Sequence, residues 1–243
     1  KFGRYRGKEL LWQVAGTENG NLLLVADRII CFRPFDIPDA GEKTPERRKF
    51  GSNLWESSLL RSWLNSEGVV NGEPGFLSYF SEKEKNMLVK SRNKFLLSLY
   101  DADIREGGSS PYFWTNSVPL LLQNYDDAYF SISEDWVFIP DVREIKELVY
   151  DNGLSIRKRA LFTDNLDIKY EAGKNHYMPY WLRTPYVNSE SMVRYVGEDG
   201  YVYHCDALND TVGVLPLVKV SFIAIKGAGS RAARRSRSAR FDS

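Results

Sequence analysis

Two cysteines and two histidines are the residues of this chain that could supply a thiolate nucleophile or a thiolate or imidazole metal ligand. Cys31 and Cys205 match no metal-ligand spacing, and only His176 and His204 could add imidazole ligands. His204 and Cys205 are neighbours in a stretch typical of a strand, where successive side chains point to opposite faces. That geometry keeps the imidazole away from the thiol, so the pair does not suit nucleophilic catalysis.

Other catalytic patterns are missing from the sequence. It contains neither the G-x-S-x-G turn of serine hydrolases nor the glycine-rich loop that binds nucleotide phosphates. We therefore expect no catalytic residue, no metal site and no enzymatic activity. Cys31 and Cys205 leave two arrangements open, and we expect two buried thiols, with one disulfide as the alternative.

Aromatic and polar residues gather in the last third of the chain, and this combination favours ligand binding. Aromatic rings next to amides and carboxylates suit the C–H faces and hydroxyls of sugars, and they equally suit protein interfaces. Strand alternation must bury one face, so we expect Trp181, Tyr195 and Tyr203 in the core. The turns must stay solvated. They carry the predicted ligand-binding residues, which are Tyr186, Asn188, Ser189, Glu190, Asn209 and Asp210.

The elements that must position these residues are strands at both ends of the chain with short helices between them. Alternation and turn residues predict strands at 10–15, 22–26, 28–32, 136–139, 181–183, 192–196, 201–204 and 213–217. Apolar spacing and capping residues predict helices at 59–64, at 81–90 and at 141–152, with loops at 34–50 and 101–129. Strands, then helices, then strands again indicate an α+β fold and not an alternating α/β sheet.

The composition predicts one domain with a basic tail. Hydrophobic residues make up 43% of the 243 residues, which is enough for a sizeable core. We expect a single domain at 1–226 and a tail at 227–243 that is disordered or not native. The tail holds five arginines, which leaves the rest of the chain mildly acidic, so nucleic acid is an expected partner only for the tail. No apolar run is long enough to span a membrane.

The order of motifs resembles a family of uncharacterised bacterial domains. The family pattern is W-x-x-S-x-L-R-x-W-L-N, then W-L-R-[ST]-P, then G-V-R-P. The residues that carry the resemblance are W-E-S-S-L-L-R-S-W-L-N at 55–65, W-L-R-T-P at 181–185 and G-V-L-P-L at 213–217, within a match that covers about residues 2–220. Leu215 stands where the family usually has Arg, so we expect packing there in place of a buried polar network.

That family is similar to the C-type-lectin-like fold shared by formylglycine-generating enzymes and by the hypervariable proteins of diversity-generating retroelements. The resemblance implies an α+β, C-type-lectin-like fold with mixed antiparallel sheets and a few short helices. Leu208-Asn209-Asp210 resembles the calcium segment of calcium-dependent lectins, but the second calcium motif of those lectins is missing. We therefore expect no cofactor, with calcium as the alternative.

These observations together predict a non-catalytic ligand-binding module of a bacterial protein, extracellular or on the cell surface, with the cytoplasm as the alternative. Its loop surface would be presented to a glycan or to a protein. Two alternatives stay open. The first is a protein-interaction or assembly component of a phage or mobile element, and the second is a degenerate metal-dependent oxidase.

Overall fold

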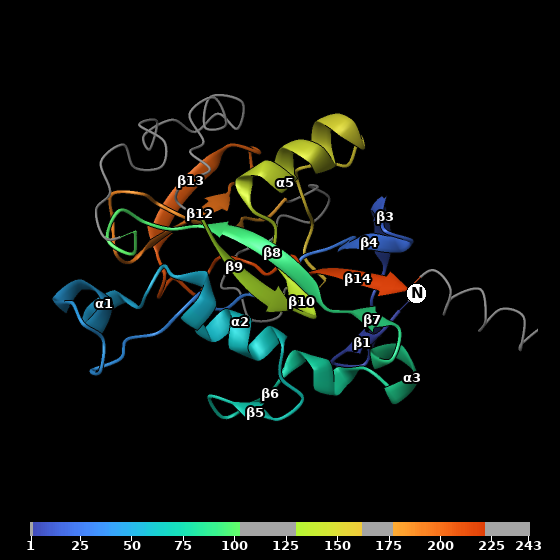
Figure 1. Cartoon of the computed structure of the whole chain (residues 1–243), viewed down its shortest axis with the longest axis horizontal. Helices are drawn as coiled ribbons and strands as arrows, with labels where there is room; N and C mark the ends of the chain where they lie inside the picture. Colours follow the sequence, from blue (N-terminus) through green and yellow to red (C-terminus); the bar gives the residue numbers. More distant parts are fainter. Residues whose placement is uncertain (1, 103–129, 162–176, 222–243) are drawn as a thin grey trace, which may run out of the picture.

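The computed structural model describes residues 2–102, 130–161 and 177–221 of the chain. Strands occupy both ends of this part of the chain, and the helical segments lie between them (Figure 1). The strands are β1 (Arg4–Tyr5), β2 (Lys8–Glu9), β3 (Trp12–Glu18), β4 (Asn21–Ala26), β5 (Val69–Val70), β6 (Glu73–Pro74), β7 (Leu88–Val89), β8 (Ser91–Leu96), β9 (Phe130–Asp135), β10 (Val137–Phe138), β11 (Tyr180–Pro185), β12 (Met192–Val196), β13 (Val202–Asp206) and β14 (Leu217–Ser221). The helical segments are α1 (Pro45–Phe50), η1 (Trp55–Ser57), α2 (Leu59–Leu64), η2 (Phe76–Tyr79), α3 (Glu82–Lys85), α5 (Val142–Lys146) and the π-helical turn η4 (Glu147–Asp151).

The largest sheet joins the two ends of the described chain. Its strand order is β10-β14-β4-β3, and β7 also pairs with β14. β3 and β4 form a hairpin whose turn residues Asn19 and Gly20 have φ of 49° and 75°, the left-handed conformation that an Asn-Gly turn adopts readily. β14 pairs antiparallel with β4 and places Leu217 opposite Val25. The last described strand thus completes the sheet that the hairpin begins.

A second sheet carries the C-terminal motifs, with strand order β11-β12-β13. Its pairing is antiparallel, and the register places Arg194 opposite His204 and Tyr195 opposite Tyr203. The strands β1–β2, β5–β6 and β8–β9 form three further antiparallel pairs. The predicted α+β class, with mostly antiparallel sheets and a few short helices, is confirmed.

The first motif segment forms η1 and α2, and its polar residues attach this helix to β9 and β10. The Arg61 Nε donates a hydrogen bond of 2.6 Å to the carboxylate of Asp135, which is fully buried. Asn65 follows the helix and accepts hydrogen bonds from the amides of Trp136 and Val137 at 2.7 and 3.1 Å. Arg61 and Asn65 of this motif therefore serve the scaffold.

The W-L-R-T-P segment forms β11, and its polar residues join this strand to α5 and β8. Arg183 is only 2% exposed, and its two terminal nitrogens donate to the carboxylate of Glu144 at 2.6 and 2.7 Å. The Nε and Nη2 of Arg183 also donate to the Lys94 carbonyl at 3.2 and 3.1 Å. The Thr184 hydroxyl accepts from the Val142 amide at the start of α5. This motif is also part of the scaffold.

The hydrophobic core draws on both sheets and on α2. Trp55, Trp63 and Trp181 are among its largest members, and none of them is more than 1% exposed. Leu215 is 1% exposed and belongs to the same cluster, so packing does occupy the position where the family pattern has Arg. The core prediction holds for Trp181 but is wrong for Tyr203, which is half-buried and donates its hydroxyl hydrogen bond outside the core.

Two predicted elements differ from the structure because of local capping and strand pairing. The predicted loop at 34–50 contains α1, whose start is fixed by Thr44 as N-cap and Pro45 in the first turn. The predicted helix at 81–90 has the expected capping box of Ser81 and Glu84, but it ends at Lys85. The residues that follow form β7 instead, because they pair with the edge of β14.

Two predicted strands are replaced by isolated bridge pairs. Ile29 pairs with Ala160 and Phe32 pairs with Gly213, so residues 28–32 form no continuous strand. The strand predicted at 213–217 begins only at its last residue, as β14. The tail at 227–243, His176 and most of the predicted loop at 101–129 lie outside the described residues. Within the described residues, none of the helices has the length and hydropathy of a membrane span.

Candidate functional site

A cavity of about 460 Å³ lies where the segment 30–34 meets two hairpin turns and the turn at Asp210. Cavities of about 300–1,000 Å³ are typical of small-ligand sites. The polar residues that line it are Tyr5, Arg6, Cys31, Arg33, Asn71, Glu73 and Asp210. We call this cavity the Arg33 pocket. Its lining combines hydrogen-bond donors, acceptors and charges of both signs.

Two hairpin turns form part of the wall of the Arg33 pocket. The turn between β1 and β2 consists of Arg6 and Gly7, with φ of 46° and 81°, and the turn between β5 and β6 consists of Asn71 and Gly72, with φ of 48° and 80°. Positive φ at both central residues is the geometry of a two-residue hairpin turn. Asn adopts it readily, whereas for Arg it costs about 1–2 kcal/mol. Such backbone strain often occurs at functional sites, and here it places a guanidinium group beside the cavity.

Arg33 is the most firmly held polar side chain of the pocket. Its guanidinium carbon lies 3.7 Å from the centre of the Trp63 ring, and its Nη2 donates to the Glu73 Oε2 at 2.6 Å. The backbone is fixed as well, because the Trp181 indole donates to the Arg33 carbonyl at 2.9 Å and the Arg33 amide donates to the Val212 carbonyl. Only 15% of the Arg33 side chain is exposed. The guanidinium is therefore preorganised for a ligand and loses little side-chain freedom on binding.

Cys31 lies beside Tyr5 and Arg33 at the same pocket. Burial raises the pKa of the Cys31 thiol, although the Arg33 charge acts in the opposite direction. Burial, with a further contribution from Cys31, also raises the pKa of the Tyr5 hydroxyl. Both groups are therefore protonated at neutral pH. A neutral thiol is a poor nucleophile, so these groups suit the recognition of a ligand better than an attack on it.

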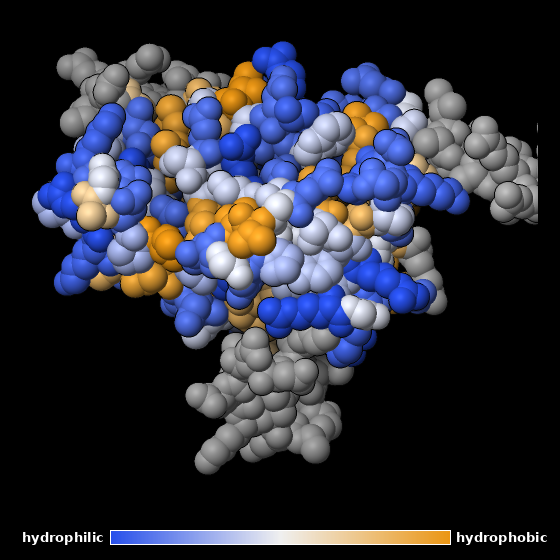
Figure 2. Space-filling model, turned by 90° about the horizontal axis from the view of Figure 1, so that it is seen from below, coloured by the Kyte–Doolittle hydropathy of each residue, from blue (hydrophilic) through white to orange (hydrophobic). Residues whose placement is uncertain are grey.

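The charges around the pocket are balanced. Arg33 is paired with Glu73. Arg6 and Asp210 are exposed, and neither forms an ion pair with another of the described residues. The pocket therefore carries two positive and two negative side chains. Figure 2 views the molecule from the side of β5–β6 and α3, and the apolar residues on that face form small areas separated by hydrophilic ones.

The predicted ligand-binding loop at 186–190 lies elsewhere, against α1 and the residues after it. The Tyr186 ring stacks on the ring of His204 with centroids 3.9 Å apart. The Asn53 side chain donates to the Ser189 carbonyl at 2.7 Å, and the Arg47 Nε donates to the carbonyl of the next residue at 2.9 Å. Asn188 is exposed. The expectation that the whole loop is solvated is therefore wrong, because these hydrogen bonds draw its backbone onto the scaffold.

The side chains of Ser189 and Glu190 are also used within the protein or enclosed by it. Ser189 is 9% exposed, and its hydroxyl accepts hydrogen bonds from the amides of Ser191 and Met192. The same hydroxyl donates to the Glu46 carboxylate at 3.1 Å. One carboxylate oxygen of Glu190 is shielded from solvent. Of the predicted loop residues, Asn188 is exposed and Tyr186 and Glu190 are partly exposed, so a ligand could reach these three.

In the second predicted turn, Asn209 forms hydrogen bonds within the protein, whereas Asp210 lines the pocket. The Asn209 side-chain oxygen accepts hydrogen bonds from the amide and the hydroxyl of Thr211 at 2.8 and 2.7 Å. A calcium ion would have to compete with both bonds for that oxygen. Asp210 is exposed and lines the Arg33 pocket. Among the residues that the structure describes, no group of three or more His, Cys, Asp or Glu side chains could hold a metal ion.

The structure does not unite the predicted site residues. Asp210 lines the Arg33 pocket, whereas no hydrogen bond or ion pair between described residues links it to the loop at 186–190. A second cavity, of about 500 Å³, adjoins Arg47, Tyr100 and Asp101. The Arg47 Nη2 donates to the Asp101 carboxylate at 2.7 Å and the Arg47 Nε to the backbone of the loop, so this arginine serves the scaffold.

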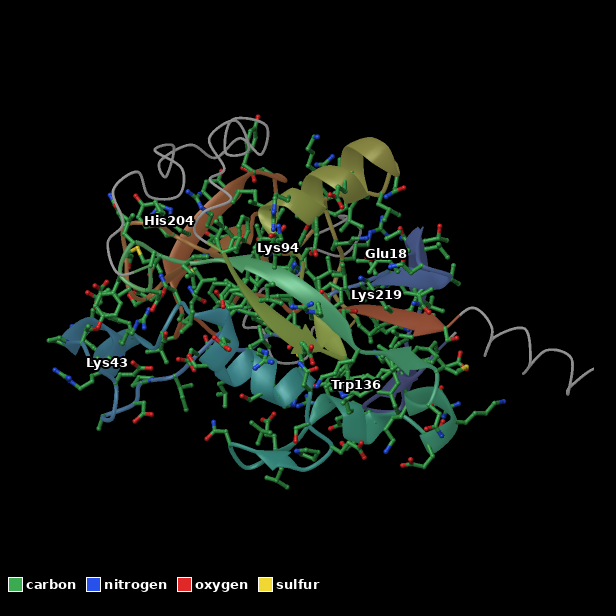
Figure 3. The ribbon with its side chains drawn as sticks, in the orientation of Figure 1. Glu18, Lys43, Lys94, Trp136, His204 and Lys219 are labelled. Atoms are coloured by element: carbon green, nitrogen blue, oxygen red, sulfur yellow. The ribbon has the colours of Figure 1, made fainter. Side chains whose placement is uncertain are left out.

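The cysteines and the described histidine are arranged as the sequence predicts for unreactive groups. Cys31 and Cys205 are both free, so the thiol alternative is confirmed and no disulfide joins them, although both are half-buried and not fully enclosed. His204 lies on β13 of the three-stranded sheet (Figure 3), where it stacks on Tyr186, while Cys205 packs against the core. Burial, together with the charge of Arg194, lowers the pKa of His204.

The two hairpin turns of the pocket have a sequence signal that the predicted site does not include. Asn71-Gly72 follows two valines and precedes Glu73, which is the pattern of a tight hairpin. Arg6-Gly7 sits between short polar and aromatic stretches in the same way. The sequence could therefore have predicted both turns. It could not have predicted that the turns meet at Arg33, because that contact joins segments far apart in the chain.

Comparison with known families identifies a family whose model covers most of the chain. The model of DUF6273, described as a domain of unknown function, matches residues 19–222. This range includes Cys31, Arg33, Asn71, Glu73 and Asp210 of the pocket but not the β1–β2 turn. No curated protein matches the chain. No solved structure matches it either.

Proposed function

Since the chain belongs to the DUF6273 family, whose function is unknown, we propose its function from the pocket: it is a non-catalytic module that binds a polar ligand at Arg33. The ligand is a polar group, either free or carried by a glycan or a protein. This proposal keeps the binding function that the sequence predicts, and it moves the site from the loop at 186–190 to the Arg33 pocket.

One observation carries the proposal, namely the way in which Arg33 is held. Its ring stacking on Trp63, its ion pair with Glu73 and its two backbone hydrogen bonds fix a guanidinium group at the edge of a cavity. Arg183 differs from Arg33, because it is 2% exposed and its guanidinium is bonded to the Glu144 carboxylate and to backbone carbonyls of the protein. The protonated thiol and phenol beside Arg33 support binding over catalysis.

We also propose that the fold is C-type-lectin-like and that the protein is displayed outside the bacterial cell or on its surface. The antiparallel sheets and short helices are compatible with this fold. The motif residues that suggested the resemblance, Arg61, Asn65 and Arg183, all perform scaffold tasks. A shared motif that builds the scaffold is what a shared fold would require.

The proposal is tested by binding screens against immobilised glycans and peptides with the wild-type chain and two single variants. Arg6→Gly removes a pocket guanidinium and relieves the strain of its positive φ, so the fold should be retained. Asn188→Ala is the control, because it truncates the exposed residue of the other predicted site. We expect ligands to be lost with Arg6→Gly and kept with Asn188→Ala. The opposite pattern would contradict the proposal and return the site to the loop.

A further inference from the structure

The class of ligand follows from the hydrogen-bonding groups of the Arg33–Glu73 pair that the ion pair itself does not use. We propose that the Arg33 pocket binds a free α-amino acid, with Arg33 donating to the ligand carboxylate and Glu73 accepting from the ligand ammonium group. This inference rests on the proposed function, because it names the ligand of the same pocket. Such a ligand carries two groups of opposite charge, an ammonium and a carboxylate, on one carbon atom.

The ion pair leaves a donor and an acceptor free on two directly bonded side chains. Arg33 uses its Nη2 for the Glu73 Oε2, at 2.6 Å, and its Nε is shielded from solvent. The guanidinium carries more N–H groups than its bonds to Glu73 and to the Cys31 thiol use, and the Glu73 Oε1 accepts no hydrogen bond from the described residues. The two groups that remain are thus a guanidinium N–H and a carboxylate oxygen that belong to directly bonded side chains.

An α-amino acid matches this arrangement in the signs of its charges. Its carboxylate and ammonium groups are attached to the same carbon, as the free N–H and the Glu73 Oε1 belong to one ion pair. Hydrogen bonds in which both partners are charged are about twice as strong as neutral ones. A simple anion would gain the Arg33 contact but would meet the Glu73 charge, and a simple cation would meet the reverse. Among charged ligands, a zwitterion complements both side chains.

The remaining charges of the pocket support the same class of ligand. Arg6 and Asp210 have opposite signs and form no ion pair with other described residues. The lining as a whole is therefore electroneutral, and a ligand without net charge can enter it without leaving an uncompensated charge. The cavity of about 460 Å³ has room for an amino acid with its side chain.

Isothermal titration calorimetry of the full chain with the twenty common amino acids tests the inference. For the amino acid that binds best, the N-acetyl derivative lacks the ammonium charge and the amide derivative lacks the carboxylate charge. We expect each derivative to bind about tenfold or more weakly, since one charge-assisted hydrogen bond is worth about that factor. Equal affinity for the amino acid and for both derivatives would overturn the inference.

Two matched glutamate variants locate the effect. Glu73→Gln removes the charge proposed to bind the ammonium group, and Glu67→Gln removes a similar exposed carboxylate that is paired with Lys85, also at 2.6 Å, outside the pocket. We expect Glu73→Gln to weaken amino-acid binding about tenfold and Glu67→Gln to leave it unchanged. Equal effects of the two variants would contradict the assignment of Glu73.

The outcomes separate this inference from the proposed function. If no amino acid binds but a sugar or a peptide binds and loses affinity in Arg6→Gly, the inference is wrong and the proposed function stands. If no amino acid, sugar or peptide binds with an affinity that depends on Arg6 or Glu73, the inference and the proposed function are both wrong. Binding of an amino acid that depends on Glu73 supports both.

Discussion

Removal of Glu144 should destabilise the protein more than the loss of any exposed carboxylate. Glu144 accepts both terminal nitrogens of Arg183 at 2.6 and 2.7 Å, and it also closes the capping box of α5 with Asp141. Glu144→Ala would leave the guanidinium of Arg183, only 2% exposed, without this counter-ion. Breaking a buried ion pair by removing one partner costs about 3–5 kcal/mol. The lost capping box adds about 1 kcal/mol.

The assay is urea unfolding at neutral pH, together with thermal unfolding of the same samples. For a chain of 243 residues, a loss of 1 kcal/mol lowers the Tm by about 2–4 °C, so Glu144→Ala should lower it by about 10–20 °C. Glu147→Ala is the matched control, because Glu147 is exposed on the next turn of the helix. Its free energy of unfolding should stay within about 0.5 kcal/mol of the wild type.

A double-mutant cycle with Arg183→Met then isolates the ion pair. Because each single variant leaves one charge without its partner, the double variant should lose less stability than the two single variants together. A loss below about 1 kcal/mol in Glu144→Ala, or strict additivity in the cycle, would refute the role given to this pair in joining β11 to α5.

Two further predictions concern packing and pH. Gly213→Ala should lower the free energy of unfolding in urea by about 2 kcal/mol or more. A Cβ at this position would lie 2.3 Å from the side chain of Ile29 and 2.9 Å from the Pro179 carbonyl. Wild-type stability in this variant would contradict the close approach. Burial, with a smaller contribution from Asp206, raises the pKa of the Cys205 thiol from 9.0 to about 12, so its contribution to stability is complete below pH 9 and is lost as the pH rises toward 12. Cys205→Ala should therefore show a shallower alkaline loss of unfolding free energy than the wild type between those pH values, and parallel curves would refute this.

The starts of the helices were predictable because capping is local. Ser58, Ser81 and Asp141 each cap a helix in the structure, as their side chains predict, and Ser81 and Asp141 also form capping boxes with the Glu three positions later. Helix lengths were less predictable, because strand pairing with β14 takes over after Lys85. The α+β class was also predictable, because it follows from the order of local sequence patterns along the chain.

The candidate site was not predictable from local patterns. Its residues come from the β1–β2 turn, from Cys31 and Arg33, from the β5–β6 hairpin and from Asp210, and only the tertiary fold brings them together. The ligand-binding site was predicted in the aromatic segment at 186–190 because solvated loops and scaffold turns have similar compositions. Ser189 shows the difference, because its hydroxyl satisfies backbone amides of its own turn.

The most direct test of the Arg33 pocket is an NMR titration of the full chain with its best-binding ligand, read at assigned amide signals. We expect the largest shift changes in the β1–β2 turn, at Cys31 to Arg33 and in the β5–β6 hairpin, because these segments line the cavity. Signals from the loop at 186–190 should move little. Changes that concentrate in that loop and leave Arg33 and Glu73 unaffected would contradict the central claim that the ligand binds at Arg33.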